Sequence, residues 1–279
     1  MAATPMKEVI NLVNGEASRL GEFLSGLSVQ DWSRQSACEG WVKGDVVAHL
    51  TGGAESWVNS INRALAGDAG PPPGQAFLTD GDRGSEVIGE TARASYQQLG
   101  SQLLEKFTAG YDHLAQVLAT LDAEDWKRSC FHRRGPMPVG DYVEVRVQEL
   151  VVHSWDIRSG VDQTAELWEE SLALMVGRVP RWLSNAFRPG LDLPTPIRYR
   201  FDVQNPVPVK EDLLVKGECF QAESTGGEPA DVTFRCNTGT YILLIYGRLD
   251  VEGAIAAGRL TVAGSREQAT SFTAWFQGF

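Results

Sequence analysis

The chain has 279 residues, of which 43% are hydrophobic and 22% charged, and its formal net charge is −11. This composition is typical of a globular protein, and the length allows one large domain or two ordinary ones. An acidic surface repels phosphate backbones, so we do not expect nucleic acid as a partner. The densest apolar run, residues 240–246, is far shorter than the roughly 20 residues that span a bilayer, so we expect no membrane association.

The first residues are amphipathic and lack the apolar centre of a secretory signal. The four cysteines, Cys38, Cys130, Cys219 and Cys236, are widely separated and show no CxxC spacing. A chain of this size buries a core without disulfide bonds. We therefore expect reduced thiols and a cytoplasmic location.

The first two thirds of the chain carry apolar residues at helical spacing. Gly and Pro residues in the segment 67–74 end one helical pattern, and Gly160 ends another. We expect the chain to turn at 28–32 and a long third helix to bend at Gly110. The predicted helices cover residues 6–27, 43–66, 85–121, 139–159 and 167–186.

The pattern changes at residues 188–196, which are rich in proline. Alternation of apolar and polar residues then predicts strands, followed by a capped buried helix, a short strand and a closing helix. These elements cover 197–203, 212–224, 230–236, 237–250, 260–265 and 266–276. We predict an α plus α+β protein: a helical-bundle domain over 1–187 and a small α+β domain over 188–279.

The predicted helix over 139–159 carries five polar side chains within a band roughly 80° wide. They are Tyr142, Arg146, Glu149, His153 and Asp156. Apolar residues flank the band on both sides, which indicates burial inside a bundle, where polar groups need partners. Glu149 and His153, four residues apart, can reach one metal ion from the same helix face, as in other bundle metal sites.

A third ligand must come from elsewhere in the chain. We expect His132, in a basic loop, at the surface and His113 in solvent, which leaves His49. His49 lies roughly 130° from the apolar stripe of its helix, and Gly52 and Gly53 follow on its side, where they allow a close approach. Spacing alone leaves open a structural histidine and an ordinary contact between Glu149 and His153.

Two stretches, "CEGWVKGDVVAHL" (38–50) and "QELVVHSWDI" (148–157), together with the α+β tail, resemble the mycothiol-dependent maleylpyruvate isomerase family. The resemblance implies a DinB-like four-helix bundle and a sterol-carrier-like C-terminal domain. It also implies a divalent metal ion, typically zinc, on His49, Glu149 and His153. In this interpretation Cys38 and Trp41 are structural residues at the helix entrance. The family's C-terminal domain supplies an arginine to the substrate site; we expect Arg248, with Arg266 as its rival.

Three protein ligands leave a position on zinc for water or a thiol, and a coordinated thiol is deprotonated. With the family resemblance, this open position implies a zinc-dependent enzyme that uses mycothiol, an isomerase or a thiol S-transferase, and acts on a small acidic electrophile. Asp156 is expected to orient a ligand or cap its helix. Tyr142 and Arg146 are cavity candidates, although an ion pair of Arg146 with Glu149 or Asp156 is favoured. A hydrolase using zinc-bound water and a non-catalytic module for small molecules or lipids are the alternatives. The electrophile, the thiol and the oligomeric state stay open.

Overall fold

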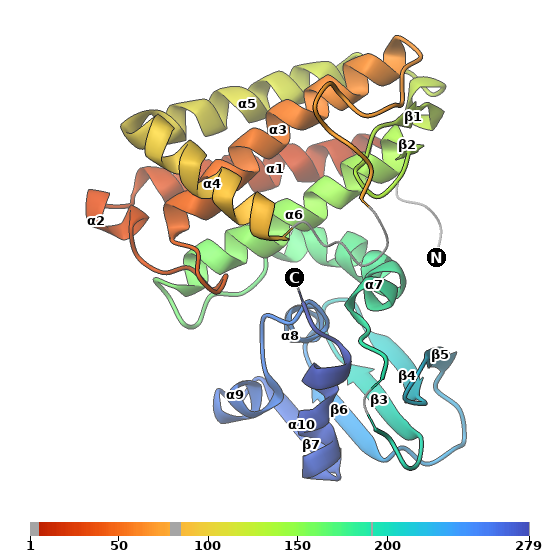
Figure 1. Ribbon diagram of the computed structural model, residues 1–279. Coiled ribbons are helices and arrows are strands. Elements are labelled where there is room, and N and C mark those ends of the chain that lie inside the picture. The colour runs from red at the N-terminus through yellow and green to blue at the C-terminus, as the bar shows by residue number, and fades with distance from the viewer. Residues whose placement is uncertain (1–5, 79–84, 191, 279) are drawn as a thin grey trace. The chain divides into compact units, whose positions relative to one another are not determined.

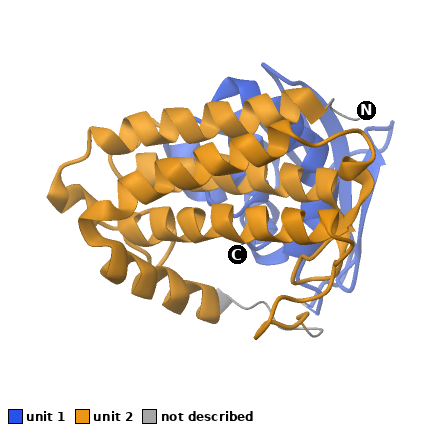
Figure 2. Cartoon of the chain, turned by 90° about the horizontal axis from the view of Figure 1, so that it is seen from above, with its two compact units in different colours: residues 1, 166–279 blue, residues 2–165 orange. Residues whose placement is uncertain are grey.

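The computed structural model describes residues 6–78, 85–190 and 192–278, and the chain divides into two compact units at residues 165 and 166 (Figures 1 and 2). Helix α7 (Leu172–Ala186) clusters with the second unit, whereas the sequence prediction had placed it before the boundary. Its packing against α8 (Thr238–Ile245) explains this, because Trp182 donates from Nε1 to the Ile245 carbonyl at 3.1 Å. In the parts of the chain that the structure covers, every helix is too short or too polar to cross a membrane.

The first unit is a four-helix bundle, as the fold prediction required. Its helices are α1 (Met6–Ser25), α3 (Lys43–Leu65), α5 (Leu103–Ala119) and α6 (Val139–Ser159). Helices α1 and α3 each pack against both α5 and α6, which closes the bundle around Val13, Leu50, Leu114 and Val147. The short helix α2 (Val29–Trp32) stands where a turn was expected, and Ser28 and Asp31 cap it reciprocally.

The helix predicted over 85–121 is in fact two helices. A 3₁₀ turn, η1 (Gly100–Gln102), separates α4 (Ser85–Leu99) from α5 because Gly100 has a φ of +49°, which L side chains rarely adopt. The bend expected at Gly110 stays a prediction, because α5 runs without a break through this residue. Gly110 lies inside α5, where a Cβ atom would meet Ala54 at 3.6 Å, so a small residue there allows α5 to approach α3.

A small hairpin leads into α6. After the 3₁₀ turn η2 (Asp125–Lys127), strands β1 (Ser129–Cys130) and β2 (Met137–Pro138) pair antiparallel, and their turn contains His132. The sequence of this segment indicates a basic loop and does not predict the pairing of its two ends.

The second unit contains a five-stranded sheet of order β5-β4-β3-β6-β7, in which only β3 and β6 pair in parallel. The strands are β3 (Ile197–Val203), β4 (Val209–Val215), β5 (Phe220–Ser224), β6 (Val232–Cys236) and β7 (Leu260–Gly264). Tyr199, Phe201 and Phe234 pack against Phe272 of α10 (Arg266–Trp275). The 3₁₀ turn η3 (Glu169–Ser171) precedes α7, and α9 (Val251–Ala256) follows α8.

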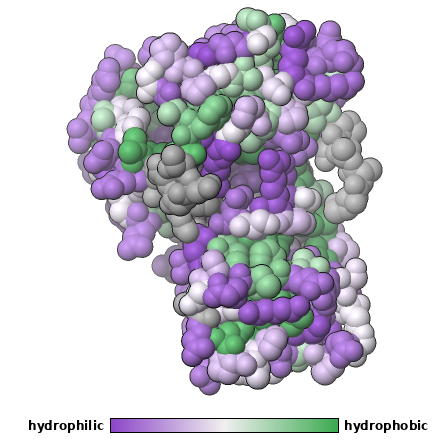
Figure 3. Space-filling model, turned by 45° about the vertical axis from the view of Figure 1, so that its right-hand side comes forward, coloured by the Kyte–Doolittle hydropathy of each residue, from purple (hydrophilic) through white to green (hydrophobic). Residues whose placement is uncertain are grey.

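Two elements of this unit differ from the prediction. The strand expected over 212–224 is a hairpin, because Gly217, with a φ of +80°, reverses the chain between β4 and β5. Helix α9 was not predicted as a separate helix; Asp250 caps it by accepting a hydrogen bond from the Gly253 N–H at 2.7 Å. Figure 3 shows hydrophilic side chains over much of one face, with hydrophobic side chains between them.

Candidate metal centre

Two facing rows of side chains on α3 and α6 form the centre of the first unit. Along α3 the row repeats at helical spacing, and along α6 it is the polar band predicted from the sequence. Contacts between the rows occur at successive levels, each about one helical turn from the next. The rows consist of His49, Gly53, Trp57 and Ser60 on α3, and of Tyr142, Arg146, Glu149 and His153 on α6.

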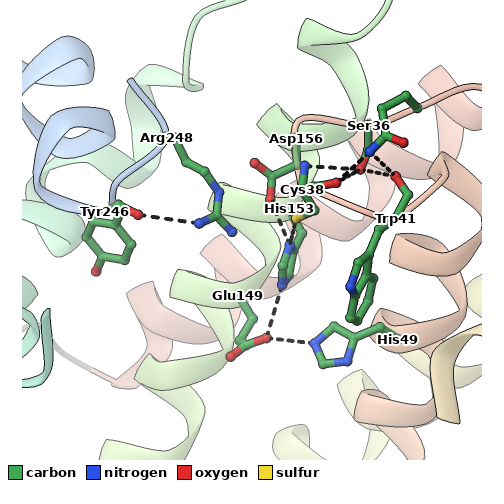
Figure 4. Close-up of polar contacts among 10 residues, drawn as sticks. Ser36, Cys38, Trp41, His49, Glu149, His153, Asp156, Tyr246 and Arg248 are labelled. Carbon is green, nitrogen blue, oxygen red and sulfur yellow. Dashed lines mark hydrogen bonds and ion pairs between the residues drawn. The ribbon is translucent and has the colours of Figure 1, made fainter. Parts of the chain in front are cut away.

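The level nearest the N-terminus of α3 joins two imidazoles to one carboxylate (Figure 4). Nε2 of His49 lies 3.1 Å from Oε2 of Glu149, and Nε2 of His153 lies 3.6 Å from the same oxygen. The two imidazole rings meet edge to face with centroids 5.1 Å apart. His49 also contacts the Trp41 ring edge to face, with centroids 5.6 Å apart. Three donor atoms therefore converge from two helices about 100 residues apart in sequence.

Asp156 binds the ring nitrogen of His153 that does not face Glu149. Its fully buried carboxylate accepts a hydrogen bond from Nδ1 of His153 at 2.9 Å and another from the Cys38 thiol, also at 2.9 Å. With Nδ1 engaged by Asp156, Nε2 is the ring nitrogen that faces Glu149. Carboxylates hold metal-ligating histidines in the same way, fixing tautomer and ring orientation.

The turn over residues 36–41 places Cys38 against Asp156. The Trp41 N–H donates to the Cys38 carbonyl at 3.1 Å, and Gly40 has the positive φ of +73° that such a turn needs at this position. Ser36 donates from Oγ to the Trp41 carbonyl at 2.8 Å. The Ala37 N–H donates to the backbone carbonyl of Asp156 at 2.9 Å, which ties the turn to the end of α6.

Burial and mutual contact set the charges of the three converging groups. Burial alone would raise the pKa of Glu149, but its hydrogen bonds with His153 and His49 hold that pKa well below its usual value. Burial opposes the charged form of His153 too, yet Asp156, Cys38 and Glu149 together raise its pKa well above the usual value. The pKa of His49 is lowered, chiefly by burial. Glu149 is thus an anion and His49 a neutral imidazole, two forms that ligate metals, whereas His153 must release the proton on Nε2 before that nitrogen can bind a metal ion.

The donor set fits a divalent metal ion of the zinc type. Two ligands 2.0–2.2 Å from a tetrahedral ion lie roughly 3.3–3.6 Å apart, and the observed separations from Glu149 to the two imidazoles are 3.1 and 3.6 Å. A second group, Cys38, His153 and Asp156, also lies within metal-ligating distance. In that group the carboxylate of Asp156 lies behind His153 and engages its Nδ1, which is the place of a carboxylate that supports a metal-ligating histidine, and this favours the first group.

Family models match both units. The model of the mycothiol maleylpyruvate isomerase N-terminal domain matches residues 13–158, more than half of the chain. The chain belongs to this family. The model of the SCP-2 sterol transfer family matches residues 197–277, so the mycothiol maleylpyruvate isomerase domain is followed by a sterol-carrier-like domain, as predicted.

Solved structures agree on the fold of this family member. A crystal structure of the mycothiol-dependent maleylpyruvate isomerase superposes with a TM-score of 0.66 at 15% identity, covering 94% of this chain and 96% of that one. A histidine-to-alanine mutant of that enzyme gives a TM-score of 0.65 at 14% identity, with the same coverage of both chains. A comparison with curated protein sequences finds no significant match. At this identity the structural likeness shows the DinB-like and sterol-carrier-like folds alone.

The other predicted residues of this mycothiol maleylpyruvate isomerase domain have varied surroundings. Tyr142 is buried, and its hydroxyl lies 3.4 Å from Oγ of Ser60. His113 is exposed, as expected. His132 was expected at the surface but is half-buried, because the β1–β2 hairpin brings its ring within 6.1 Å of the Tyr142 ring. Arg146 is buried, and among the described residues it forms neither of the ion pairs favoured from the sequence.

The two C-terminal arginines differ in their surroundings. Arg266 forms a surface ion pair with Glu252, its Nε lying 2.7 Å from Oε1. Arg248 donates from Nη1 to the Tyr246 carbonyl at 3.4 Å within the second unit. The predicted contact of Arg248 with substrate stays a prediction.

Sequence reasoning missed the role of Cys38 in this site. The thiol was interpreted as packing, whereas it donates to the carboxylate that fixes His153. No local pattern announces this contact, since it joins residues 118 positions apart. The hairpin did leave a signal: two short apolar runs flank "RRGP", a sequence typical of a turn.

Proposed function

We propose that the chain is a metal-dependent enzyme that uses mycothiol, and that His49, Glu149 and His153 hold a divalent ion, preferably zinc. The observation that carries the proposal is the convergence of two imidazoles on one carboxylate in a domain of the mycothiol maleylpyruvate isomerase family. Two nitrogens and one oxygen suit zinc and leave a position for an exogenous ligand. Bound zinc would supply the positive charge that keeps a thiol ionised at neutral pH.

The chain's own side chains prepare the site for that ion. Asp156 keeps the proton of His153 on Nδ1, so that Nε2 is available as a ligand. Glu149 contributes the one negative charge among the three ligands. Trp41 covers the His49 ring and limits the access of water to it.

The reaction that we propose is the isomerisation of a small cis-alkene conjugated with a carbonyl group. Addition of a thiol converts the double bond to a single bond, about which the molecule rotates. Loss of the same thiol restores the alkene in the trans form and returns the thiol unchanged. An enzyme that released the thiol adduct as its product, without eliminating the thiol, would instead be a thiol S-transferase. A reducing, cytoplasmic environment suits either activity, and the four cysteines of the chain are free thiols.

Metal analysis of single variants tests the ligands. Wild-type protein purified without chelator is expected to hold about one zinc ion per chain, and His49→Ala, Glu149→Gln and His153→Ala to lose most of it. His113→Ala is the matched control, because this histidine is exposed on α5. Zinc content that survives in His153→Ala would show that the ligand assignment is wrong.

Activity with and without thiol tests the reaction class. The zinc-loaded protein is expected to convert maleylpyruvate to its trans isomer only when mycothiol is present, as followed by ultraviolet absorbance. Turnover of an ester or amide substrate without thiol would indicate a hydrolase. Stoichiometric metal with no thiol binding in a thermal-shift assay would favour a non-catalytic binding module.

A further inference from the structure

A buried guanidinium lies about one helical turn from the candidate metal ligands, toward the N-terminus of α6. Arg146 is 8% exposed and projects from α6 across to α3. Its guanidinium lies over the Trp57 ring, an arrangement that holds the cation by its attraction to the aromatic face. Gly53 makes room for it, since a Cβ atom at this position would lie 2.6 Å from Nη1.

This cation has no anionic partner among the described residues. Its Nε is fully enclosed and makes no hydrogen bond, and the ring of Trp57 is the contact that the structure records for the guanidinium. Burial lowers the pKa of Arg146, while the charge of Glu149 raises it without forming an ion pair. Buried charges are ordinarily paired, so a lone buried guanidinium points to an anion that arrives from outside.

The neighbouring hairpin carries two further cations, Arg133 and Arg134, beside a His132 that is neutral at neutral pH. His132 lies beside Tyr142, which is one turn before Arg146 on α6. Burial lowers the pKa of His132 to about 4, and the charges of Arg133, Arg134 and Arg146 contribute to this. Glu149 is the carboxylate that acts on both Arg146 and His132, and the site proposed above would place a divalent cation on it.

The spacing relative to the candidate metal ligands is short. Arg146 and Glu149 are three residues apart on α6, and Gly53 and His49 are four apart on α3. Residues at these separations lie on one helix face with Cβ atoms roughly 5–6 Å apart. An anion bound to Arg146 would thus lie within a few bond lengths of a group held by His49, Glu149 and His153.

We propose that Arg146 is the carboxylate-binding residue of the electrophilic substrate, and that Trp57 and Gly53 hold its guanidinium in place for this. The inference rests on the proposed function and assigns the residue that would bind the carboxylate of its acid substrate. A guanidinium binds a carboxylate with two parallel hydrogen bonds, which fixes the orientation of the acid as well as its position.

Calorimetric titration with maleate, a small cis-alkene with two carboxylates, tests the assignment. Arg146→Gln is expected to bind maleate roughly 10- to 100-fold more weakly than wild type. Arg146→Lys should show an intermediate loss, because lysine keeps the positive charge but cannot make two parallel hydrogen bonds to a carboxylate. Arg128→Gln is the matched control, because it removes an arginine that pairs with Asp125 at the surface. The uncharged diamide of maleic acid should bind weakly to all four proteins.

Three readouts separate the outcomes. Wild-type maleate affinity in both Arg146 variants would overturn the proposal. A melting temperature that falls in Arg146→Gln while maleate affinity is unchanged would assign the residue a structural role; removal of an unpaired buried charge should instead leave the melting temperature equal or higher. Zinc content, measured on each protein, reports on the proposed function separately. Titration repeated after chelator treatment shows whether maleate depends on Arg146 or on the metal.

Discussion

Asp156 is the residue on which the geometry of the candidate site depends most. It is fully buried, and its carboxylate takes hydrogen bonds from His153 and from Cys38, while its backbone carbonyl takes one from Ala37. A carboxylate in this position both orients the imidazole and makes its free nitrogen a better donor. The orientation of His153 therefore depends on the 36–41 turn as well as on α6.

Substitution of this carboxylate should weaken the metal site without removing a ligand. We expect Asp156→Asn to lower zinc affinity about 10- to 100-fold, because the amide binds the His153 Nδ1–H less strongly than the carboxylate does. Competition with a chromogenic chelator measures the change.

Cys38 supplies the control for this prediction. Cys38→Ser keeps a hydroxyl donor toward Asp156 and should retain zinc affinity close to that of wild type. Complete loss of zinc in Cys38→Ser, with zinc retained in His49→Ala, would place the ion instead on Cys38, His153 and Asp156.

At the scale of elements, helices were predicted better than their interruptions. All five long helical patterns fall on helical segments, the third of them on both α4 and α5, because burial of an apolar face selects a period of 3.6 residues. The break at Gly100 was missed, since a glycine inside an apolar pattern does not reveal a positive φ. The hairpin at Gly217 was missed for the same reason.

The polar band on α6 was readable because its period and its apolar flanks lie within one helix. The residues of α3 that lie opposite this band could not be predicted, because they depend on how α3 packs against α6. Glu149 and His153 were therefore selected from the helix alone, whereas His49 needed the family resemblance. The stacking of Arg146 on Trp57 also depends on the packing of α3 against α6, so the sequence of either helix alone does not predict it.

Two adjacent glycines on α3 test this packing as a matched pair. At Gly52 a Cβ atom would meet nothing within 4 Å, so Gly52→Ala should stabilise the protein by about 0.5–1 kcal/mol through the helix propensity of alanine. At Gly53 a Cβ atom would displace the guanidinium of Arg146. Gly53→Ala should lack this gain and should bind maleate more weakly. Urea unfolding and calorimetry measure both, and equal behaviour of the two variants would contradict the close packing of Arg146 on α3.

On the scale of the molecule, the two units were foreseen in kind and order because a helical period gives way to an alternating one near residue 190. The helix before that point clusters with the sheet-containing unit. The apolar pattern of this helix predicts that one face is buried but does not identify the element that covers it. In the structure that element is α8, and Trp182 stacks on Tyr246 at its end.

Zinc should act as a clamp between α3 and α6 of the first unit. A ligand that binds only the folded state adds about 2.7 kcal/mol of stability at 100 times its dissociation constant. Removal of zinc by chelator is therefore expected to speed amide hydrogen exchange in both helices, as measured by mass spectrometry. His153→Ala should show no such response to chelator, and equal exchange of wild type with and without zinc would contradict the clamp.

The layout of the facing rows has an evolutionary consequence. The residues proposed for metal binding and the residue proposed for substrate selection occupy different turns of the same two helices. If both proposals hold, a descendant can exchange Arg146, Trp57 or Gly53 and acquire a new range of substrates while its metal ligands stay unchanged. Divergence by such single exchanges would let one ancestral scaffold serve many metabolic routes.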